Sequence, residues 1–225
     1  VIRDYEINRG SAGLLIALAL LVAAGFGLPG GVVISRMGIA RAYTVGWWLA
    51  GLMTLSFLAP NYLSLLALRL SFGLGFALVL IATGPLLLRW FRPKEVLVMN
   101  GLNTAVLGLG IAISIATAAP LAGVLGWQNS LSVFGAISLV GAAAWTVLGK
   151  VPGDSVRRSG SMSFRAIPRL IRNRQIVLLL LADGGVLVHY TALTAWLPAF
   201  YTEVRGMTPT GAGFATGLLP FIGVF

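Results

Sequence analysis

The chain has 225 residues, of which 58% are hydrophobic and only 10% are charged, and its net charge is +10. Soluble domains carry roughly a quarter charged residues, so a chain this apolar is expected in a lipid bilayer. It has no cysteine and one histidine, His189, which excludes disulfides and thiolate chemistry and leaves too few ligands for a zinc or haem site. We therefore expect no cofactor, no metal and no enzymatic active site.

Apolar runs recur along the whole chain. A helix that crosses the ~30 Å hydrocarbon core of a bilayer needs about 20 residues. Six runs have about this length and a seventh stops at the last residue; they are 11–34, 41–59, 62–88, 96–124, 131–148, 176–201 and 211–225. The short alternating segments of a membrane barrel are absent from this pattern. The sequence predicts an all-α, polytopic membrane helix bundle with about seven spans.

The two ends of the sequence are unusual for a complete membrane protein. The chain begins with the polar residues 1–10 and without Met, and it stops inside the apolar run 211–225. We therefore expect the chain to be a piece of a longer protein.

The basic residues show which side of the membrane each loop occupies. Twelve of the 16 Lys and Arg residues lie in three loops on one side: Arg36, Arg41, Arg89, Arg92, Lys94, Lys150, Arg157, Arg158, Arg165, Arg169, Arg172 and Arg174. Cytoplasmic loops are enriched in Lys and Arg, so this side is predicted to be the cytoplasmic side of the inner (plasma) membrane. The positive charge then reflects topology, and we expect no nucleic-acid partner.

The longest loop, 150–174, is basic and polar and is predicted to be cytoplasmic. It divides the chain into a first half-bundle (1–149), a linker (150–174) and the start of a second half-bundle (175–225). Within the linker the apolar residues Phe164, Ile167, Leu170 and Ile171 fall near helical spacing, with arginines between them. This pattern fits an amphipathic helix on the inner leaflet, where anionic lipids attract the arginines, or equally a solvated linker.

The loop between the first two spans reads Gly31-Val-Val-Ile-Ser35-Arg36-Met-Gly38. It resembles the signature loop Gly-x-x-x-Asp-Arg-x-Gly of the major facilitator superfamily. Gly31, Arg36 and Gly38 match in register, and Ser35 stands where that family has Asp. The resemblance implies that Gly31, Arg36 and Gly38 form a gating motif, although its acidic partner is missing.

Three further segments resemble the same family in the expected order. They are Arg69-x-x-x-Gly73-x-Gly75, the loop from Trp90 to Glu95, and Ala119-Pro120-x-x-Gly123, which partly matches the family's antiporter motif. The resemblance covers the whole chain. It implies that the chain runs from the family's second helix into its eighth, and thus holds seven of twelve spans.

Two charged side chains, Arg69 and Asp183, lie well inside the predicted spans. A charge at the bilayer centre costs at least about 2.5–3.5 kcal/mol, so each needs a partner or a wet cavity. The family resemblance implies that both spans line a central cavity. We hypothesise that Arg69 binds an anionic substrate group and that Asp183 is a proton acceptor or a gating partner. Alternatively, Arg69 bonds backbone carbonyls, and Asp183 caps a helix that breaks before Gly184-Gly185.

Polar residues also recur along two of the predicted helices. Asp183, Tyr190 and Thr194 share one face of the sixth span, whereas His189 faces elsewhere and is either a packed residue or a site for substrate or proton. The fourth span carries a stripe of polar and small residues, Asn103, Gly110, Ser114 and Thr117. These stripes line a permeation path or join helices through hydrogen bonds, and the second role suits Ser114 and Thr117 best. Asn103 and Tyr190 are candidates for substrate binding.

The sequence favours a secondary active transporter that moves a small solute by alternating access, and Arg69 favours an organic or inorganic anion as that solute. Its expected partners are this small molecule, a coupling proton or ion, and membrane lipids. A drug or amphiphile efflux antiporter is the alternative within the class. A membrane channel or another seven-span protein without transport activity is the alternative outside it.

Overall fold

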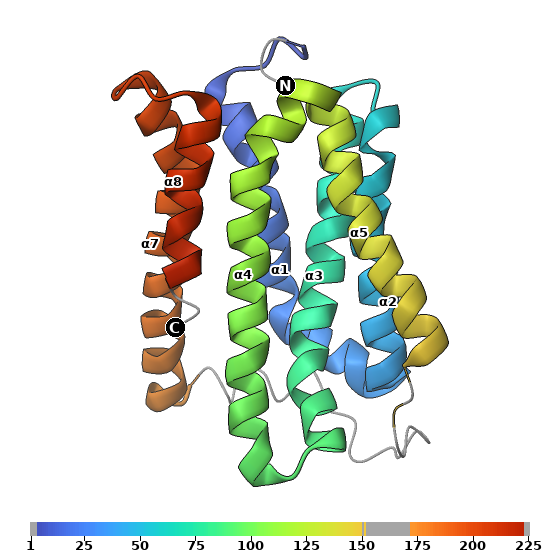
Figure 1. Ribbon diagram of the computed structural model, residues 1–225. Coiled ribbons are helices and arrows are strands. Elements are labelled where there is room, and N and C mark those ends of the chain that lie inside the picture. The colour runs from blue at the N-terminus through green and yellow to red at the C-terminus, as the bar shows by residue number, and fades with distance from the viewer. Residues whose placement is uncertain (1–3, 150, 152–171, 223–225) are drawn as a thin grey trace. The chain divides into compact units, whose positions relative to one another are not determined.

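The computed structural model describes residues 4–149, 151 and 172–222, and every regular element within them is a helix (Figure 1). The elements in chain order are α1 (Arg9–Met37), α2 (Ile39–Gly51), the 3-10 helix η1 (Leu52–Leu58), α3 (Tyr62–Trp90), α4 (Pro93–Leu125), α5 (Trp127–Leu148), α7 (Arg174–Glu203) and α8 (Pro209–Ile222). The predicted all-α membrane bundle is confirmed. The proposed amphipathic helix around Phe164, Ile167, Leu170 and Ile171 lies outside the described residues.

Five of the helices are long and apolar enough to cross a bilayer: α1, α3, α4, α5 and α7. The predicted run 41–59 is instead divided between the 13 residues of α2 and the 7 residues of η1. At ~1.5 Å per α-helical residue and ~2.0 Å per 3-10 residue, α2 and η1 together extend about 33 Å. Together they therefore match the ~30 Å thickness of the hydrocarbon core.

Local sequence signals explain where the helices begin and end. Asn61 caps α3, because its side chain accepts a hydrogen bond from the Ser64 N–H at 2.9 Å while its own N–H donates to the Ser64 hydroxyl. Pro93 starts α4, and the Glu95 carboxylate accepts a hydrogen bond from the Arg92 N–H at 2.9 Å. These caps satisfy backbone donors that a helix end leaves free.

The described residues form two compact units. Unit 1 comprises residues 4–100, 125–149 and 151, and unit 2 comprises residues 101–124 and 172–222. Helix α4 contributes its first residues to unit 1 and most of its length to unit 2. The predicted division at the linker 150–174 remains a prediction.

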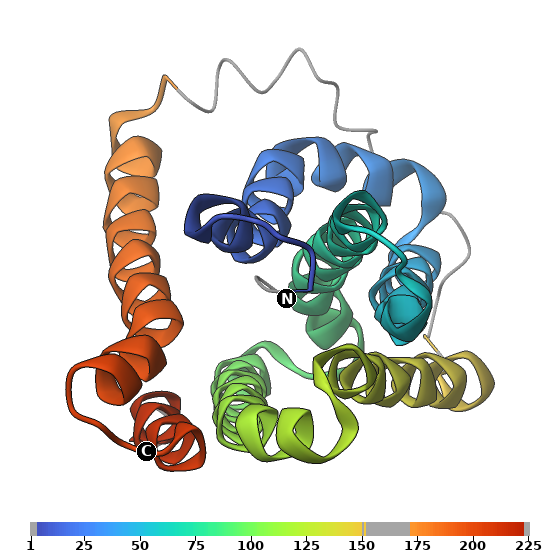
Figure 2. The same ribbon diagram turned by 90° about the horizontal axis from the view of Figure 1, so that it is seen from above.

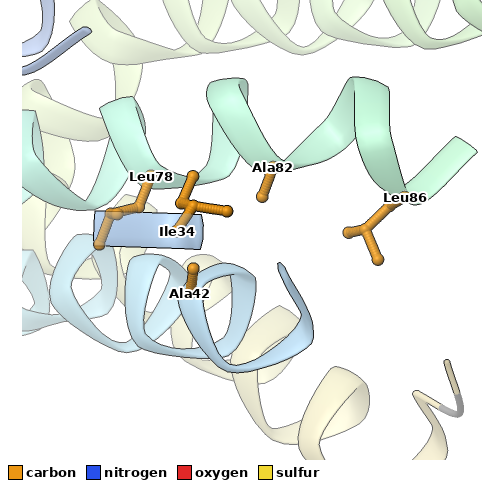
Figure 3. Packing of buried hydrophobic residues seen from close by; sticks show 5 residues of the cluster. All are labelled: Ile34, Ala42, Leu78, Ala82 and Leu86. Atoms are coloured by element: carbon orange, nitrogen blue, oxygen red, sulfur yellow. The ribbon is translucent and has the colours of Figure 1, made fainter. Parts of the chain in front are cut away.

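Helix α3 is the centre of unit 1 and packs against both α1 and α2 (Figure 2). At the end of the unit near Gly38, side chains of these three helices form an apolar cluster of Ile34, Ala42, Leu78, Ala82 and Leu86 (Figure 3). All five residues are buried. Alanines in this cluster let the helix backbones approach closely, which is how helices associate in lipid.

Two glycines of α3 meet the neighbouring helices backbone to backbone. A Cβ on Gly73 would lie 2.7 Å from the carbonyl oxygen of Ala19 in α1. A Cβ on Gly75 would collide with the carbonyl oxygen of Gly46 in α2. No larger residue fits at either glycine without moving a helix, so these contacts fix the distance of α3 from both neighbours.

Helix α5 completes unit 1 by packing against α2 and η1. A Cβ on Gly135 of α5 would collide with the backbone of Thr54 in η1. The Phe57 N–H of η1 donates a hydrogen bond of 2.9 Å to the Ser132 hydroxyl of α5. The contact between η1 and α5 is therefore close and partly polar.

Unit 2 has a seam of small residues on α8. Ala212, Gly213, Thr216 and Gly217 are buried, and Cβ atoms on Gly213 and Gly217 would lie 3.1 and 3.0 Å from carbonyl oxygens of α4. Helix α7 packs beside α8 (Figure 1). Among the described residues of α7 none is buried, so this helix offers its surface to lipid or to further protein.

Candidate functional site

Arg69 lies within the membrane-spanning part of α3. It is the eighth residue of the helix, ~10.5 Å from its first residue at ~1.5 Å per residue. Leu65 and Gly73 lie one turn away on either side, and Gly73 touches α1. Arg69 therefore emerges on the side of α3 that is turned toward α1.

The guanidinium of Arg69 has an unused hydrogen-bond donor. Its Nε atom is enclosed by protein and has no hydrogen-bond partner among the described residues. Buried donors are almost always paired, and an unpaired donor on a charged group is especially costly. The alternative prediction was that Arg69 bonds backbone carbonyls. No carbonyl of the described residues accepts a hydrogen bond from its Nε atom. The arrangement leaves an N–H available to an acceptor that the described part of the protein does not provide.

The surroundings of Arg69 on α3 are apolar. Leu65, one turn away, is only 1% exposed, and the rings of Phe72 and Phe76 stack with centroids 6.0 Å apart in the following turns. Hydrogen bonds and ion pairs are stronger in such a low-dielectric environment than in water. An anion that reached Arg69 would thus be held more strongly than at an exposed arginine.

Asp183 and Tyr190 lie on one face of α7, seven residues apart, as the sequence predicted. The helix continues through Gly184 and Gly185, so the alternative that Asp183 caps a break at these glycines is wrong. Asp183 is exposed and Tyr190 is half-buried. The Thr194 hydroxyl on the same face donates to the Tyr190 carbonyl at 2.9 Å, which leaves the carboxylate and the phenol as the polar groups of this face.

His189 and Asn103 are both exposed, on α7 and α4 respectively. The hydroxyls of Ser114 and Thr117 donate to the carbonyls of Ile111 and Ile113, at 2.9 and 2.7 Å. These bonds stay within α4, whereas we expected them to join helices.

The candidate substrate-binding residues are divided between the two units. Arg69 belongs to unit 1, and the other candidate substrate-binding residues belong to unit 2.

The predicted gating motif lies at the turn between α1 and α2. Gly31 is inside α1 and Arg36 is exposed in its last turn. Gly38 joins the two helices with φ of 92°, a conformation that residues with a Cβ rarely adopt. The Ser35 hydroxyl, at the position where Asp was expected, donates to the Val32 carbonyl of its own helix at 2.7 Å. Gly38 is therefore required by the backbone itself.

A hydrogen-bonded group at the opposite end of unit 1 was not predicted. We call it the Ala59 clasp; it consists of Tyr5, Ala59, Trp127 and Gln128. The Tyr5 hydroxyl donates to the Ala59 carbonyl at 2.8 Å, and the Gln128 amide donates to the same carbonyl at 3.4 Å. The rings of Tyr5 and Trp127 meet edge to face with centroids 5.4 Å apart. No sequence pattern links residues this far apart along the chain.

A pocket of about 500 Å³ lies near the other end of unit 1. Its walls include the aromatic side chains of Tyr43, Trp47, Trp90 and Trp145. The Trp145 indole N–H donates to the Thr44 hydroxyl at 3.0 Å, which fixes the ring against α2. The pocket has no charged lining residue and does not include Arg69.

An all-helical fold with five helices able to cross a bilayer defines a multi-pass membrane protein. The sequence profile of the Major Facilitator Superfamily matches residues 1–225. The chain belongs to this superfamily, as the motifs around Gly31, Arg69 and Pro120 led us to expect.

Relatives of known name are distant but cover nearly the whole chain. A nitrite extrusion protein of Bacillus subtilis is 25% identical over 95% of this chain and 53% of its own length. A hexuronate transporter of Bacillus subtilis is 24% identical, over 98% of this chain and 55% of its own length. A D-galactonate transporter of Escherichia coli is 23% identical, over 99% of this chain and 57% of its own length. The chain thus spans little more than half the length of these three relatives.

Proposed function

We propose that the chain is part of a secondary active transporter that moves a small anionic solute across the inner membrane by alternating access, and that Arg69 binds the anion. The observation that carries this proposal is the enclosed Nε of Arg69, which has no acceptor among the described residues. A charge inside a span is costly unless it is used, and a substrate anion would supply both the missing acceptor and the compensating charge.

The named relatives support an anionic substrate. Their names refer to nitrite, hexuronate and galactonate, each of which is an anion at neutral pH. The planar guanidinium group binds carboxylates and small oxoanions through two parallel N–H bonds, which a lysine cannot do. Arg69 suits either a sugar acid or an inorganic anion.

We assign the remaining candidates to roles around this anion. Asn103 and Tyr190 would donate hydrogen bonds to the substrate, and Asp183 would take up and release the coupling proton, with His189 as a second candidate. Gly31, Arg36 and Gly38 would control opening on the cytoplasmic side. Each of these roles is a proposal that rests on residue type and on position within the helix.

The test uses the full-length protein in proteoliposomes with labelled nitrite, a hexuronate and galactonate as substrates. We expect Arg69→Gln to lower substrate affinity about 10-fold or more, because a hydrogen bond to a charged group contributes about 1.5–3 kcal/mol. Arg69→Lys keeps the charge but loses the bidentate geometry, so its substrate affinity should lie between those of Arg69→Gln and the unchanged protein.

Arg92→Gln is the matched control, because Arg92 is exposed at the turn between α3 and α4. It removes one positive charge without touching the interior of a span, and should transport normally. Unchanged affinity in Arg69→Gln, with the variant folded as judged by its thermal unfolding, would rule out the role of Arg69. Saturable uptake with counterflow would separate a carrier from a channel.

A further inference from the structure

The second span of the chain changes its helix type partway across. It is α-helical over Ile39–Gly51 and then 3-10 helical over Leu52–Leu58. Runs of 3-10 helix longer than three or four residues are uncommon because their hydrogen-bond geometry is poorer. Seven such residues in a single membrane span require a local cause, and such stretches often mark hinges.

Thr54, in the middle of η1, has a buried hydroxyl without a hydrogen-bond partner among the described residues. Threonines in α-helices of this protein donate to the carbonyl four residues earlier, as Thr44 does to Ala40 and Thr83 does to Val79. In an α-helical segment Thr54 would donate to Ala50 in the same way. The 3-10 conformation therefore costs Thr54 a bond that the α conformation would restore.

Contacts outside the segment compensate for this loss. The Phe57 N–H of η1 donates to the Ser132 hydroxyl of α5 at 2.9 Å, so a side chain from the neighbouring helix satisfies a backbone donor of η1. Ser132 itself donates to the Gln128 carbonyl at 3.0 Å, which orients its hydroxyl. Ser132 thus stabilises the 3-10 form specifically.

Both ends of η1 are attached to other helices. Beyond its last residue, the Ala59 carbonyl accepts hydrogen bonds from Tyr5 and Gln128, and before its first residue α2 is fixed through the contact of Gly46 with Gly75. A 3-10 residue rises ~2.0 Å and an α-helical residue ~1.5 Å. Seven residues are therefore about 3.5 Å longer as 3-10 helix. The two attachments hold the segment at the greater length.

We propose that η1 is a conformational switch between two helix types. It stays 3-10 helical while Ser132 and the Ala59 clasp hold it, and becomes α-helical when they release it. The change shortens the second span by about 3.5 Å and pairs the Thr54 hydroxyl with Ala50. The switch gives unit 1 two states at the end that carries Tyr5 and Gln128. It is independent of the role proposed for Arg69.

Spin labels on the second span can measure this length. The labels would be placed on Val45→Cys and Leu58→Cys, whose side chains are 39% and 62% exposed, in the full-length protein with any other cysteine replaced. Pulsed electron resonance then gives the distance between them. Ser132→Ala should shift the population to a distance shorter by about 3–4 Å. Thr54→Val removes the bond that favours the α form and should shift the population toward the longer distance.

Matched controls remove similar hydroxyls elsewhere. Thr83 donates within α3 and Ser138 within α5, so Thr83→Val and Ser138→Ala should leave the distance unchanged. Tyr5→Phe releases the Ala59 clasp and should shorten the distance as Ser132→Ala does, which covers the case in which Ser132→Ala does not fold. Equal distances in all variants, or a shift of Thr54→Val and Tyr5→Phe in the same direction, would overturn the proposal.

Discussion

At Gly38 the backbone turns from α1 into α2 with φ of 92° and ψ of 149°. This region is accessible to glycine and is costly for every residue with a Cβ. Backbone geometry is therefore the reason for a glycine at position 38 of the predicted gating motif, whether or not the motif controls a gate. Gly31, the first glycine of the motif, has regular helical surroundings, and a Cβ added to it would meet nothing within 4 Å.

The two motif glycines should respond oppositely to alanine. Gly38→Ala should lower the free energy of unfolding by about 1–3 kcal/mol, because alanine is forced into an unfavourable conformation. Gly31→Ala should be neutral or stabilising by up to about 1 kcal/mol, because alanine favours a helix interior and has room there. Thermal unfolding in detergent, followed by tryptophan fluorescence, measures both. An equal effect of the two substitutions would contradict the explanation given for Gly38.

At the same scale, sequence reasoning reached some residues of the candidate site and missed other features of the structure. Arg69 and Asp183 could be identified because a charge inside an apolar run is conspicuous without any structure. The free Nε of Arg69 and the unpaired hydroxyl of Thr54 could not, because both depend on which of the described neighbours fail to reach them. Tyr5 was missed because its partner Ala59 offers only a backbone carbonyl, which every residue has.

Among the helices, α3 determines the arrangement of unit 1. Gly73 and Gly75, which resemble a family motif in the sequence, have a direct structural reason: one meets α1 and the other meets α2. Lipid provides no hydrophobic driving force between helices, so close packing at small residues must supply the association. The two glycines of the motif are thus explained by helix contact, whereas the Nε atom of Arg69 at its start has no contact among the described residues that would explain it.

Adding a single methyl group to α3 tests whether Gly75 is needed for contact with α2. Gly75→Ala should destabilise unit 1 by about 1–3 kcal/mol, because the added Cβ collides with the backbone of α2. Gly84→Ala on the same helix is the control, because a Cβ there meets nothing within 4 Å. Unfolding in denaturant or heat compares the variants. If Gly75→Ala were as stable as Gly84→Ala, the contact with Gly46 would not be the one that holds α2 to α3.

Most of the helices could be predicted from the sequence, but the change of helix type within the second span could not. The predicted run 62–88 corresponds to α3 (Tyr62–Trp90) in the structure. Its ends follow from the cap Asn61 and from Pro93, which starts the next helix. The change from α2 to η1 has no signal in the sequence, because the apolar run continues unbroken through Gly51 and Leu52. That change depends on Ser132 and Ala59, and hence on contacts between segments far apart in the chain.

At the scale of the whole molecule, the proton coupling proposed for Asp183 can be tested by transport. If Asp183 carries the coupling proton, Asp183→Asn should abolish uptake driven by a pH gradient but retain exchange of substrate across the membrane, because a neutral amide cannot release a proton. Asp183→Glu should retain part of the coupled uptake. Uptake and counterflow in proteoliposomes distinguish these outcomes. Coupled uptake in Asp183→Asn at the normal rate would exclude Asp183 as the proton carrier.

Orientation can be tested at the two ends of α7. Arg174 begins the helix and Val204 follows its last residue, and both side chains are exposed. If the basic loops are cytoplasmic, Arg174→Cys should react with a membrane-impermeant thiol reagent only in inside-out vesicles, and Val204→Cys only in right-side-out vesicles or whole cells. These 225 residues contain no cysteine, and any cysteine elsewhere in the full-length protein would be replaced. The opposite labelling pattern would invert the predicted topology.

The contacts of Gly73 and Gly75 also bear on how the protein is made. Both helices that these glycines touch, α1 and α2, precede α3 in the chain. The three-helix core of unit 1 can therefore assemble as soon as α3 has left the ribosome and entered the membrane, before α4 has entered it. Later helices would then insert beside a preformed core, and a ribosome stalled after Leu125, with α4 still in its exit tunnel, should already hold a nascent chain in which α1, α2 and α3 can be crosslinked to one another.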